Sequence, residues 1–169
     1  MGVKLVASSG GSVELVPTNT TSNFTVTVPA KTGTMAMDGP AFSAYQSSSQ
    51  SITLNTFTKV LFQTEQFDTN NNFSSSTFTP TVAGYYQINS CVYTNANASR
   101  ILISIYKNGS EITRPFDVTA TTIIGGSASQ LLYLNGSTDY VEIYVYLGAS
   151  VSISATSYTI FNGAMVRGA

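Results

Sequence analysis

Apolar side chains recur at every second position in two segments of this chain, and this alternation limits the possible folds more than any other feature. In DYVEIYVYL, residues 139–147, Val141, Ile143 and Val145 fall on one face. RILISIYKNGS, residues 100–110, repeats the pattern with isoleucines at every second position and then reaches Asn108-Gly109, a tight-turn dipeptide. A period of two is typical of β-strands, because successive side chains point to opposite faces of a sheet.

Further short segments show strand composition between turn-rich pieces, whereas no window of ten or more residues has the 3.6-residue period of a helix. We therefore predict an all-β fold with almost no helix. Many short antiparallel strands at this chain length favour a jelly-roll β-sandwich with Greek-key connections. The further predicted strands are 12–16, 24–28, 41–46, 57–63, 85–93, 117–124, 128–134, 151–154 and 158–166.

The scarcity of charge excludes several classes of function. Charged residues make up 9% of the chain and the net charge is −1, so no basic surface would bind nucleic acid or an acidic membrane. No apolar stretch approaches the roughly 20 residues that span a bilayer. With no histidine and one cysteine, Cys91, the chain cannot build a Ser-His-Asp triad or a thiolate metal cluster. We expect no enzyme, cofactor or metal; a glycosidase pair of carboxylates is the remaining catalytic alternative.

The first 38 residues differ from the rest of the chain. They contain two short alternating segments split by a polar turn, and they have too few apolar groups for a core of their own. The break at Asp38-Gly39-Pro40 predicts a joint between an N-terminal β arm, residues 1–38, and a globular domain, residues 39–169. Because the arm cannot fold alone, it is expected to lie on its own domain, on sister chains or on a foreign surface.

A series of short motifs follows in order along the domain. The motifs are AFSAY at 41–45, the FD…F…FTPxxAGYY pattern from Phe67 to Tyr86, IYKNG at 105–109, LxLxxGxxDxV from Leu132 to Val141, and FNGAMV at 161–166. Over about 130 residues this series resembles the globular head domain of complement component one q, part of the tumour-necrosis-factor-like jelly-roll group. The resemblance implies a jelly roll that assembles as a homotrimer.

The resemblance assigns the strands at 100–107 and 141–147 to the inner sheet, where neighbouring subunits of the trimer cover the second face. That face carries Tyr106, Tyr144 and Tyr146, with Leu102 beside them, so these residues are the predicted trimer interface. The alternative is that loops or the arm of the same chain cover them. Some relatives in this group bind calcium at the trimer apex, but the scattered acids here do not form a calcium loop.

The arm itself, through V-P-A-x-x-G-T at 28–34, is similar to segments that precede C-terminal modules in bacteriophage virion proteins. We therefore expect a homotrimeric capsid decoration protein, cement protein or short fibre on the virion surface, made in the host cytoplasm. It would bind major capsid or tail proteins through Val13, Leu15, Phe24, Val26 and Val28. The alternative is a receptor-binding tip of a tail fibre that binds host glycans through loops 68–76 and 94–100.

Overall fold

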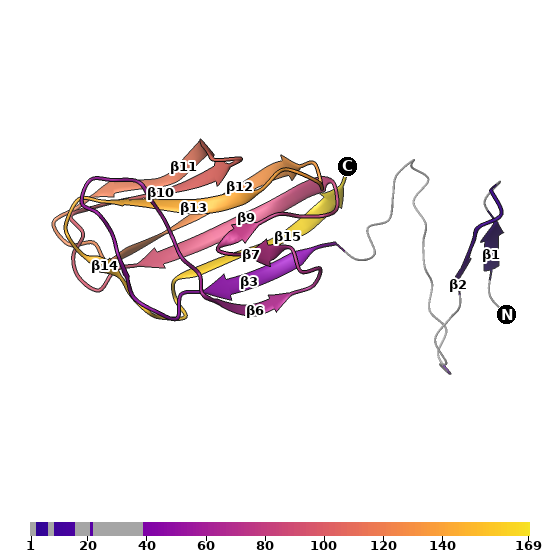
Figure 1. The fold of residues 1–169 in the computed structure, drawn as a ribbon, viewed down its shortest axis with the longest axis horizontal. Coiled ribbons are helices and arrows are strands. Elements are labelled where there is room, and N and C mark those ends of the chain that lie inside the picture. Colours follow the sequence, from indigo (N-terminus) through magenta and orange to yellow (C-terminus); the bar gives the residue numbers. More distant parts are fainter. Residues whose placement is uncertain (1–2, 7–8, 16–20, 22–38) are drawn as a thin grey trace. The chain divides into compact units, whose positions relative to one another are not determined.

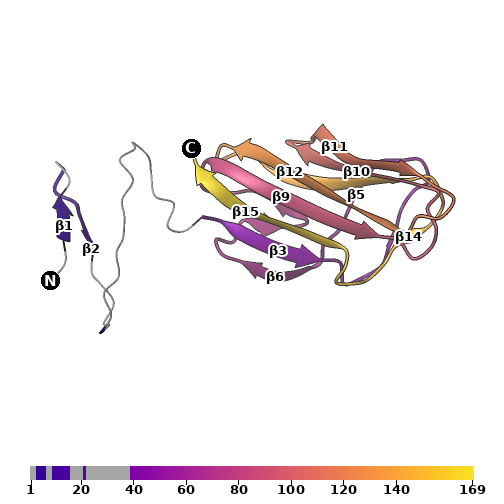
Figure 2. The same ribbon diagram turned by 180° about the vertical axis from the view of Figure 1, so that it is seen from behind.

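The computed structural model describes residues 3–6, 9–15, 21 and 39–169. The chain divides into two compact units, Met1–Gly33 and Thr34–Ala169. The predicted joint at residue 38 adjoins positions 34–38, which lie outside the described residues, so that boundary stays a prediction. The second unit is an all-β sandwich, and its described residues contain no helix, which confirms the predicted fold class (Figures 1 and 2).

Two antiparallel sheets make up the sandwich. The chain's closing strand lies between its first long domain strand and the strand from Gly84, so both ends of the domain are in the same sheet. The five-stranded sheet has the order β12 (Gly125–Leu134), β9 (Gly84–Tyr93), β15 (Ile160–Gly168), β3 (Ala41–Tyr45) and β6 (Thr64–Asp68). The six-stranded sheet runs β11 (Ser110–Thr119), β10 (Arg100–Lys107), β13 (Val141–Leu147), β8 (Thr77–Phe78) and β7 (Phe73–Ser74), with β5 (Thr58–Lys59) also paired to β13. β4 (Gln50–Ser51) and β14 (Ser152–Ile153) form a separate two-stranded sheet.

The core lies between the two sheets and is built from the alternating faces that the sequence predicted. On β10 and β13 the odd-numbered aliphatic residues, including Ile103 and Ile143, are fully buried. Tyr86 enters this core from β9, and its hydroxyl donates to the Val82 carbonyl at 2.6 Å. Burial raises the pKa of Tyr86 to about 12, so the phenol stays neutral. In the aromatic part of the core, Phe42 stacks on Phe73 and Phe78 and meets Phe161 edge to face.

The predicted strand at 117–124 is wrong in position, because the strand there is β11, Ser110–Thr119. The apolar alternation of β11 is interrupted by Glu111, Arg114, Pro115 and Asp117. Because β11 lies at the edge of its sheet, it does not need a continuous buried face. Of the predicted strand 57–63, only the two residues of β5 are in a strand. The sequence also missed β6 and the small β7–β8 pair, whereas the predicted 24–28 strand lies outside the described residues.

In the first unit, β1 (Val3–Val6) pairs antiparallel with β2 (Ser12–Leu15), and Val3 lies opposite Leu15. Gly10 has a φ of 90°, a backbone angle that glycine adopts without strain, and it lies in the connection between the two strands. An isolated two-stranded sheet is marginally stable in water, so this pair needs a further contact to persist. That the arm as a whole cannot form a core alone stays a prediction, because most of its residues lie outside the described ones.

Candidate functional site

The predicted interface residues lie on the outward face of the six-stranded sheet, and the chain itself covers much of that face. Phe57 packs on Tyr146 with ring centroids 5.5 Å apart, and the Tyr146 hydroxyl donates to Asn55 at 3.0 Å. Tyr106 and Tyr144 stack on each other with centroids 4.0 Å apart. The segment just before and through β5 therefore closes over these rings from within one chain.

Ion pairs flank this aromatic cluster. Arg114 makes two hydrogen bonds to Glu111, at 2.8 and 2.9 Å, and its guanidinium lies 5.1 Å from the centre of the Phe57 ring. On the other side, Lys59 Nζ donates to Glu142 Oε1 at 2.7 Å. Burial, with a further contribution from the Glu111 charge, raises the pKa of Tyr106, and burial next to Glu142 raises that of Tyr144. The cluster is thus a group of packed, neutral aromatic rings with an ion pair on each side.

Leu102 is only 3% exposed in a single chain, so it has almost no surface left for a neighbouring subunit. The interface role of Leu102 stays a prediction, and a single chain already buries this side chain. The role of Tyr106, Tyr144 and Tyr146 stays a prediction. Their contacts with Phe57 and Asn55 favour the alternative, in which the chain's own loop supplies the cover.

The outward face of the five-stranded sheet is different, because it is uncharged at its centre and exposes large apolar side chains. Tyr85 and Tyr133 lie opposite each other on β9 and β12, and their rings are 5.6 Å apart. Leu131, next along the same face of β12, is 50% exposed. The outward residues of these two strands are Tyr85, Gln87, Asn89, Cys91 and Tyr93 on β9, and Ser127, Ser129, Leu131 and Tyr133 on β12.

A ladder of hydrogen-bonded side chains crosses the middle of this face. Asn89 Nδ2 donates to Asn162 Oδ1 at 3.1 Å, and Gln87 Nε2 donates to Asn89 Oδ1 at 3.3 Å. Ser129 Oγ joins the ladder by donating to Asn89 Oδ1 at 2.8 Å. These side chains come from three neighbouring strands, β12, β9 and β15, so the ladder fixes the positions of the strands relative to one another.

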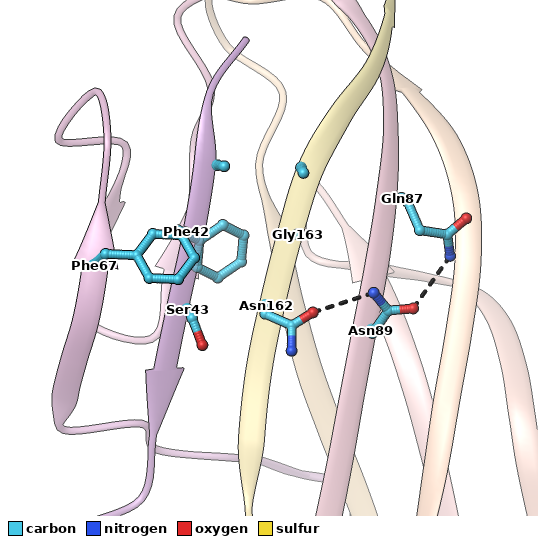
Figure 3. Close-up of a pocket in the computed structure, with 9 residues that line it drawn as sticks. Phe42, Ser43, Phe67, Gln87, Asn89, Asn162 and Gly163 are labelled. Carbon is cyan, nitrogen blue, oxygen red and sulfur yellow. Dashed lines mark hydrogen bonds between the residues drawn. The ribbon is translucent and has the colours of Figure 1, made fainter.

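Beside the ladder the face is hollowed into an open groove of about 320 Å³ (Figure 3). Small residues of β3 and β15 form its floor, among them Ser43 and Gly163. Phe67 of β6 stands at one side, 52% exposed, and the amides of Gln87 and Asn89 stand at the other. The groove therefore offers an aromatic ring, an apolar floor and neutral hydrogen-bonding groups, and none of its lining residues is charged.

The Asn-rich loops that were the alternative glycan site use their amides to build the loops. Asn72 Nδ2 donates to the Asn70 carbonyl, and Asn72 Oδ1 accepts from the Thr81 amide at 3.2 Å. Asn97 Oδ1 likewise accepts from the backbone of Ser99 and Ile123. Glycan binding by these loops stays a prediction, and these hydrogen bonds account for the asparagines without a ligand.

Of the predicted attachment residues, Phe24, Val26 and Val28 lie outside the described residues, and Val13 and Leu15 lie in β2. Within the part of the chain that the structure describes, no group of three or more His, Cys, Asp and Glu side chains could hold a metal ion. The same residues form no helix long and apolar enough to cross a bilayer.

Comparison with solved structures identifies the fold. The globular domain of zebrafish complement 1qA matches with a TM-score of 0.59 and 19% identity, over 77% of this chain and 99% of that one. The chain has the jelly-roll fold of this domain. Murine APRIL matches over 76% of this chain and all of its own, with a TM-score of 0.59 and 11% identity at pH 8.0 and of 0.57 and 12% at pH 5.0. No protein-family model and no curated protein matches the chain in sequence.

The sequence did contain a signal for the five-stranded face. Tyr86 and Ile88 were predicted to face one way along the strand at 85–93, which places Tyr85 and Gln87 on the other side. The same rule places Leu131 and Tyr133 outward on the strand at 128–134. The interface was instead predicted on the strands at 100–107 and 141–147, because the family resemblance assigned these strands to the inner sheet, and that assignment stays a prediction.

Proposed function

We propose that this chain is a homotrimeric structural protein on the surface of a bacteriophage particle, where it serves as a capsid decoration protein, cement protein or short fibre. Its work is mechanical and adhesive, and with no histidine in the chain we expect no catalysis. The observation that carries the self-association is the outward face of the five-stranded sheet, which exposes Tyr85, Leu131 and Tyr133 and has no charged side chain at its centre. Soluble monomers rarely expose large apolar patches that serve no contact.

The composition of this face supports a second copy of the chain as its partner. An exposed tyrosine offers a large, rigid contact area and a hydroxyl that can form a hydrogen bond at the polar rim of an interface. Charged residues are depleted from the centres of protein interfaces. Leu131 and the amide ladder meet that description, whereas paired charges flank the ring of Tyr106. At the edge of the five-stranded face, Lys107 lies 5.9 Å from the centre of the Tyr133 ring and is paired with Asp139. The proposed interface is therefore the five-stranded face.

The virion role rests on the arm. The similarity of V-P-A-x-x-G-T to segments of virion proteins, and the marginal β1–β2 pair, support an arm that is completed by contact with another virion protein. Three arms from one trimer would bind a particle with high avidity even if each contact were weak.

The test compares the two faces directly. Light scattering of the wild-type chain should give about three times its 17.9 kDa mass at micromolar concentration. Leu131→Lys would place an unpaired charge in the proposed interface and should dissociate the trimer, whereas Tyr144→Lys on the other sheet should leave it intact. A monomeric wild type would contradict the proposal, and dissociation by Tyr144→Lys alone would move the interface to the six-stranded sheet. Mass spectrometry of purified particles would test the virion role.

A further inference from the structure

The sequence contains three Asn-Gly dipeptides, which begin at Asn108, Asn135 and Asn162. Asparagine before glycine is prone to lose its side-chain amide, because glycine has no Cβ to shield its backbone nitrogen. That nitrogen attacks Cγ of the asparagine, ammonia leaves, and the resulting succinimide takes up water to give aspartate or isoaspartate. The attack requires the asparagine side chain to turn toward the next backbone nitrogen. Contacts of the side chain therefore decide how fast each site reacts.

Asn108 lies in the tight turn that joins β10 to β11. Lys107 pairs with Ser110 across this turn, and Asn108 and Gly109 have φ angles of 54° and 76°. Asn-Gly is the preferred sequence of such a two-residue turn. Both turn residues are exposed, so water has access to them. The turn therefore combines the reactive sequence with the solvent that the reaction consumes.

The segment before β13 holds the Asn108 side chain from outside the turn. Asn108 Nδ2 donates to Asp139 Oδ1 at 2.7 Å, and Asn108 Oδ1 accepts from the Tyr140 amide at 2.9 Å. Asp139 is fixed in its turn by Lys107 Nζ, 2.8 Å away. Because both ends of the Asn108 amide are engaged, these hydrogen bonds have to break before Cγ can face the Gly109 nitrogen.

The other two asparagines are held by different groups. Asn135 Oδ1 accepts from the backbone amides of Ser137 and Thr138, at 3.0 Å each, within its own turn. Asn162 lies in β15, and its Oδ1 accepts from Asn89 in the amide ladder. Among the described residues, Asn108 is thus the one of the three whose amide nitrogen is held by a carboxylate.

We propose that Asn108 is a modification site at which Asp139 sets the rate of deamidation. This inference does not depend on the proposed self-association or on the virion role. Deamidation would replace the Nδ2 donor by a carboxylate oxygen that faces Asp139 Oδ1, and like charges at hydrogen-bond distance repel each other. The modified turn cannot re-form this hydrogen bond, so the contact between the turns before β11 and before β13 is lost for the life of the chain.

Peptide mass mapping of the full chain, incubated at mildly alkaline pH, measures the rate of amide loss at each dipeptide. In the wild type, Asn108 should react at least about tenfold more slowly in the folded chain than in urea, because its hydrogen bonds must first open. Asp139→Ala removes the acceptor and should accelerate the reaction at Asn108 by about tenfold, while Asn162 in the same protein keeps its wild-type rate. An unchanged rate at Asn108 in this variant, or equal wild-type rates in the folded and unfolded chain, would overturn the proposal.

Ile143→Ala is the matched control, because it weakens the fully buried core and leaves the contacts of Asn108 intact. Its Asn108 should react at the wild-type rate. Equal acceleration by Ile143→Ala and Asp139→Ala would assign the reaction to global unfolding and overturn the proposal, as would joint acceleration of Asn108 and Asn162. Asp139→Asn keeps the volume without the charge and covers the case in which Asp139→Ala does not fold. It should also accelerate the reaction at Asn108, and a wild-type rate there would count against the role of Asp139.

Asn108→Asp reproduces the aspartate product and tests the effect on the contact between the turns. It should lower the urea midpoint at neutral pH, and the loss should shrink in acid as the facing carboxylates become protonated. Asn71→Asp is the matched control, at an exposed position with a similar φ of 53°, and it should leave the midpoint unchanged. A midpoint for Asn108→Asp as high as that of Asn71→Asp would show that the contact survives deamidation and would overturn this part of the proposal.

Discussion

At the scale of single residues, Asp139 explains why two of the sequence motifs occur together. Its carboxylate accepts hydrogen bonds from Asn108 Nδ2 at 2.7 Å and from the Asn135 amide at 3.0 Å, and pairs with Lys107 Nζ at 2.8 Å. The turn after β10 is thereby tied to the turn before β13. The motifs IYKNG and LxLxxGxxDxV are therefore in contact in the fold, because Asp139 of the second motif binds Lys107 and Asn108 of the first.

We predict that Asp139→Asn lowers stability by about 1–3 kcal/mol at pH 7, because a hydrogen-bonded ion is replaced by a neutral amide. Burial opposes ionisation of this carboxyl, but the hydrogen bonds from Lys107, Asn108 and Asn135 outweigh it and lower its pKa. A lowered pKa gives stability above the ordinary value of 3.8 that is lost as the pH falls through the native pKa. Denaturant unfolding at pH 7 and pH 2.5 should show a penalty that shrinks in acid; a constant penalty would contradict this account.

Gln46 is the opposite case, a buried polar side chain without a partner. It is fully buried, and neither its Oε1 nor its Nε2 has a hydrogen-bond partner among the described residues. Gln50, four residues later, is satisfied, because it donates to the Lys59 carbonyl and accepts from the Leu61 amide.

We predict that Gln46→Leu raises stability by about 1–3 kcal/mol, since it removes the cost of an unsatisfied buried amide at similar volume. Gln50→Leu is the matched control and should lower stability by about 1–2 kcal/mol, because it breaks two hydrogen bonds. Thermal and urea unfolding of both variants measure the difference. If Gln46→Leu destabilises the chain as much as Gln50→Leu does, the amide of Gln46 is satisfied in solution.

At the scale of elements, the central strands should carry more of the stability than the connections do. Ile143→Ala on β13 empties a fully buried site and should cost about 2–5 kcal/mol. Thr121→Ala lies at an exposed position after β11 and should cost less than about 0.5 kcal/mol. Urea unfolding of the two variants gives the comparison, and equal losses would mean that β13 does not face the core as described.

The sequence predicted elements best where burial dictates them. The alternation in 100–110 and 139–147 predicted β10 and β13 almost to the residue, because one face of each must be buried. Edge strands carry no such requirement, and the position of β11 was missed for that reason. The β7–β8 pair depends on Ser75 and Ser76 at positive φ, which no sequence periodicity reports.

The groove was beyond prediction, because it is assembled from residues of four strands that are distant in the sequence. Ser43, Phe67, Asn89 and Asn162 meet only through the strand order β9-β15-β3-β6. Each of them alone has an ordinary explanation as an outward residue on a strand. Only the sheet shows that Phe67 and the amides enclose a common space.

At the scale of the whole molecule, the arm and the jelly roll are expected to have separate tasks. The two units Met1–Gly33 and Thr34–Ala169 are each compact, and the groove and the core both lie in the second. A domain of about 130 residues with a continuous buried core is large enough to fold alone. The β1–β2 pair is too small for that and depends on an added contact.

We therefore predict that a variant beginning at Gly39 stays folded and trimeric but no longer joins the particle. Its circular dichroism and light scattering should match those of the full chain, because Gly39 precedes every strand of the sandwich. Incorporation is measured by adding this variant, and the full chain as control, to particles that lack the native copies. Losing the three arms of a trimer removes the multivalent contact, so bound copies should fall by at least about tenfold. Normal attachment of the truncated protein would place the particle contact on the jelly roll, and the exposed surfaces of the six-stranded sheet would then be the first to test by substitution.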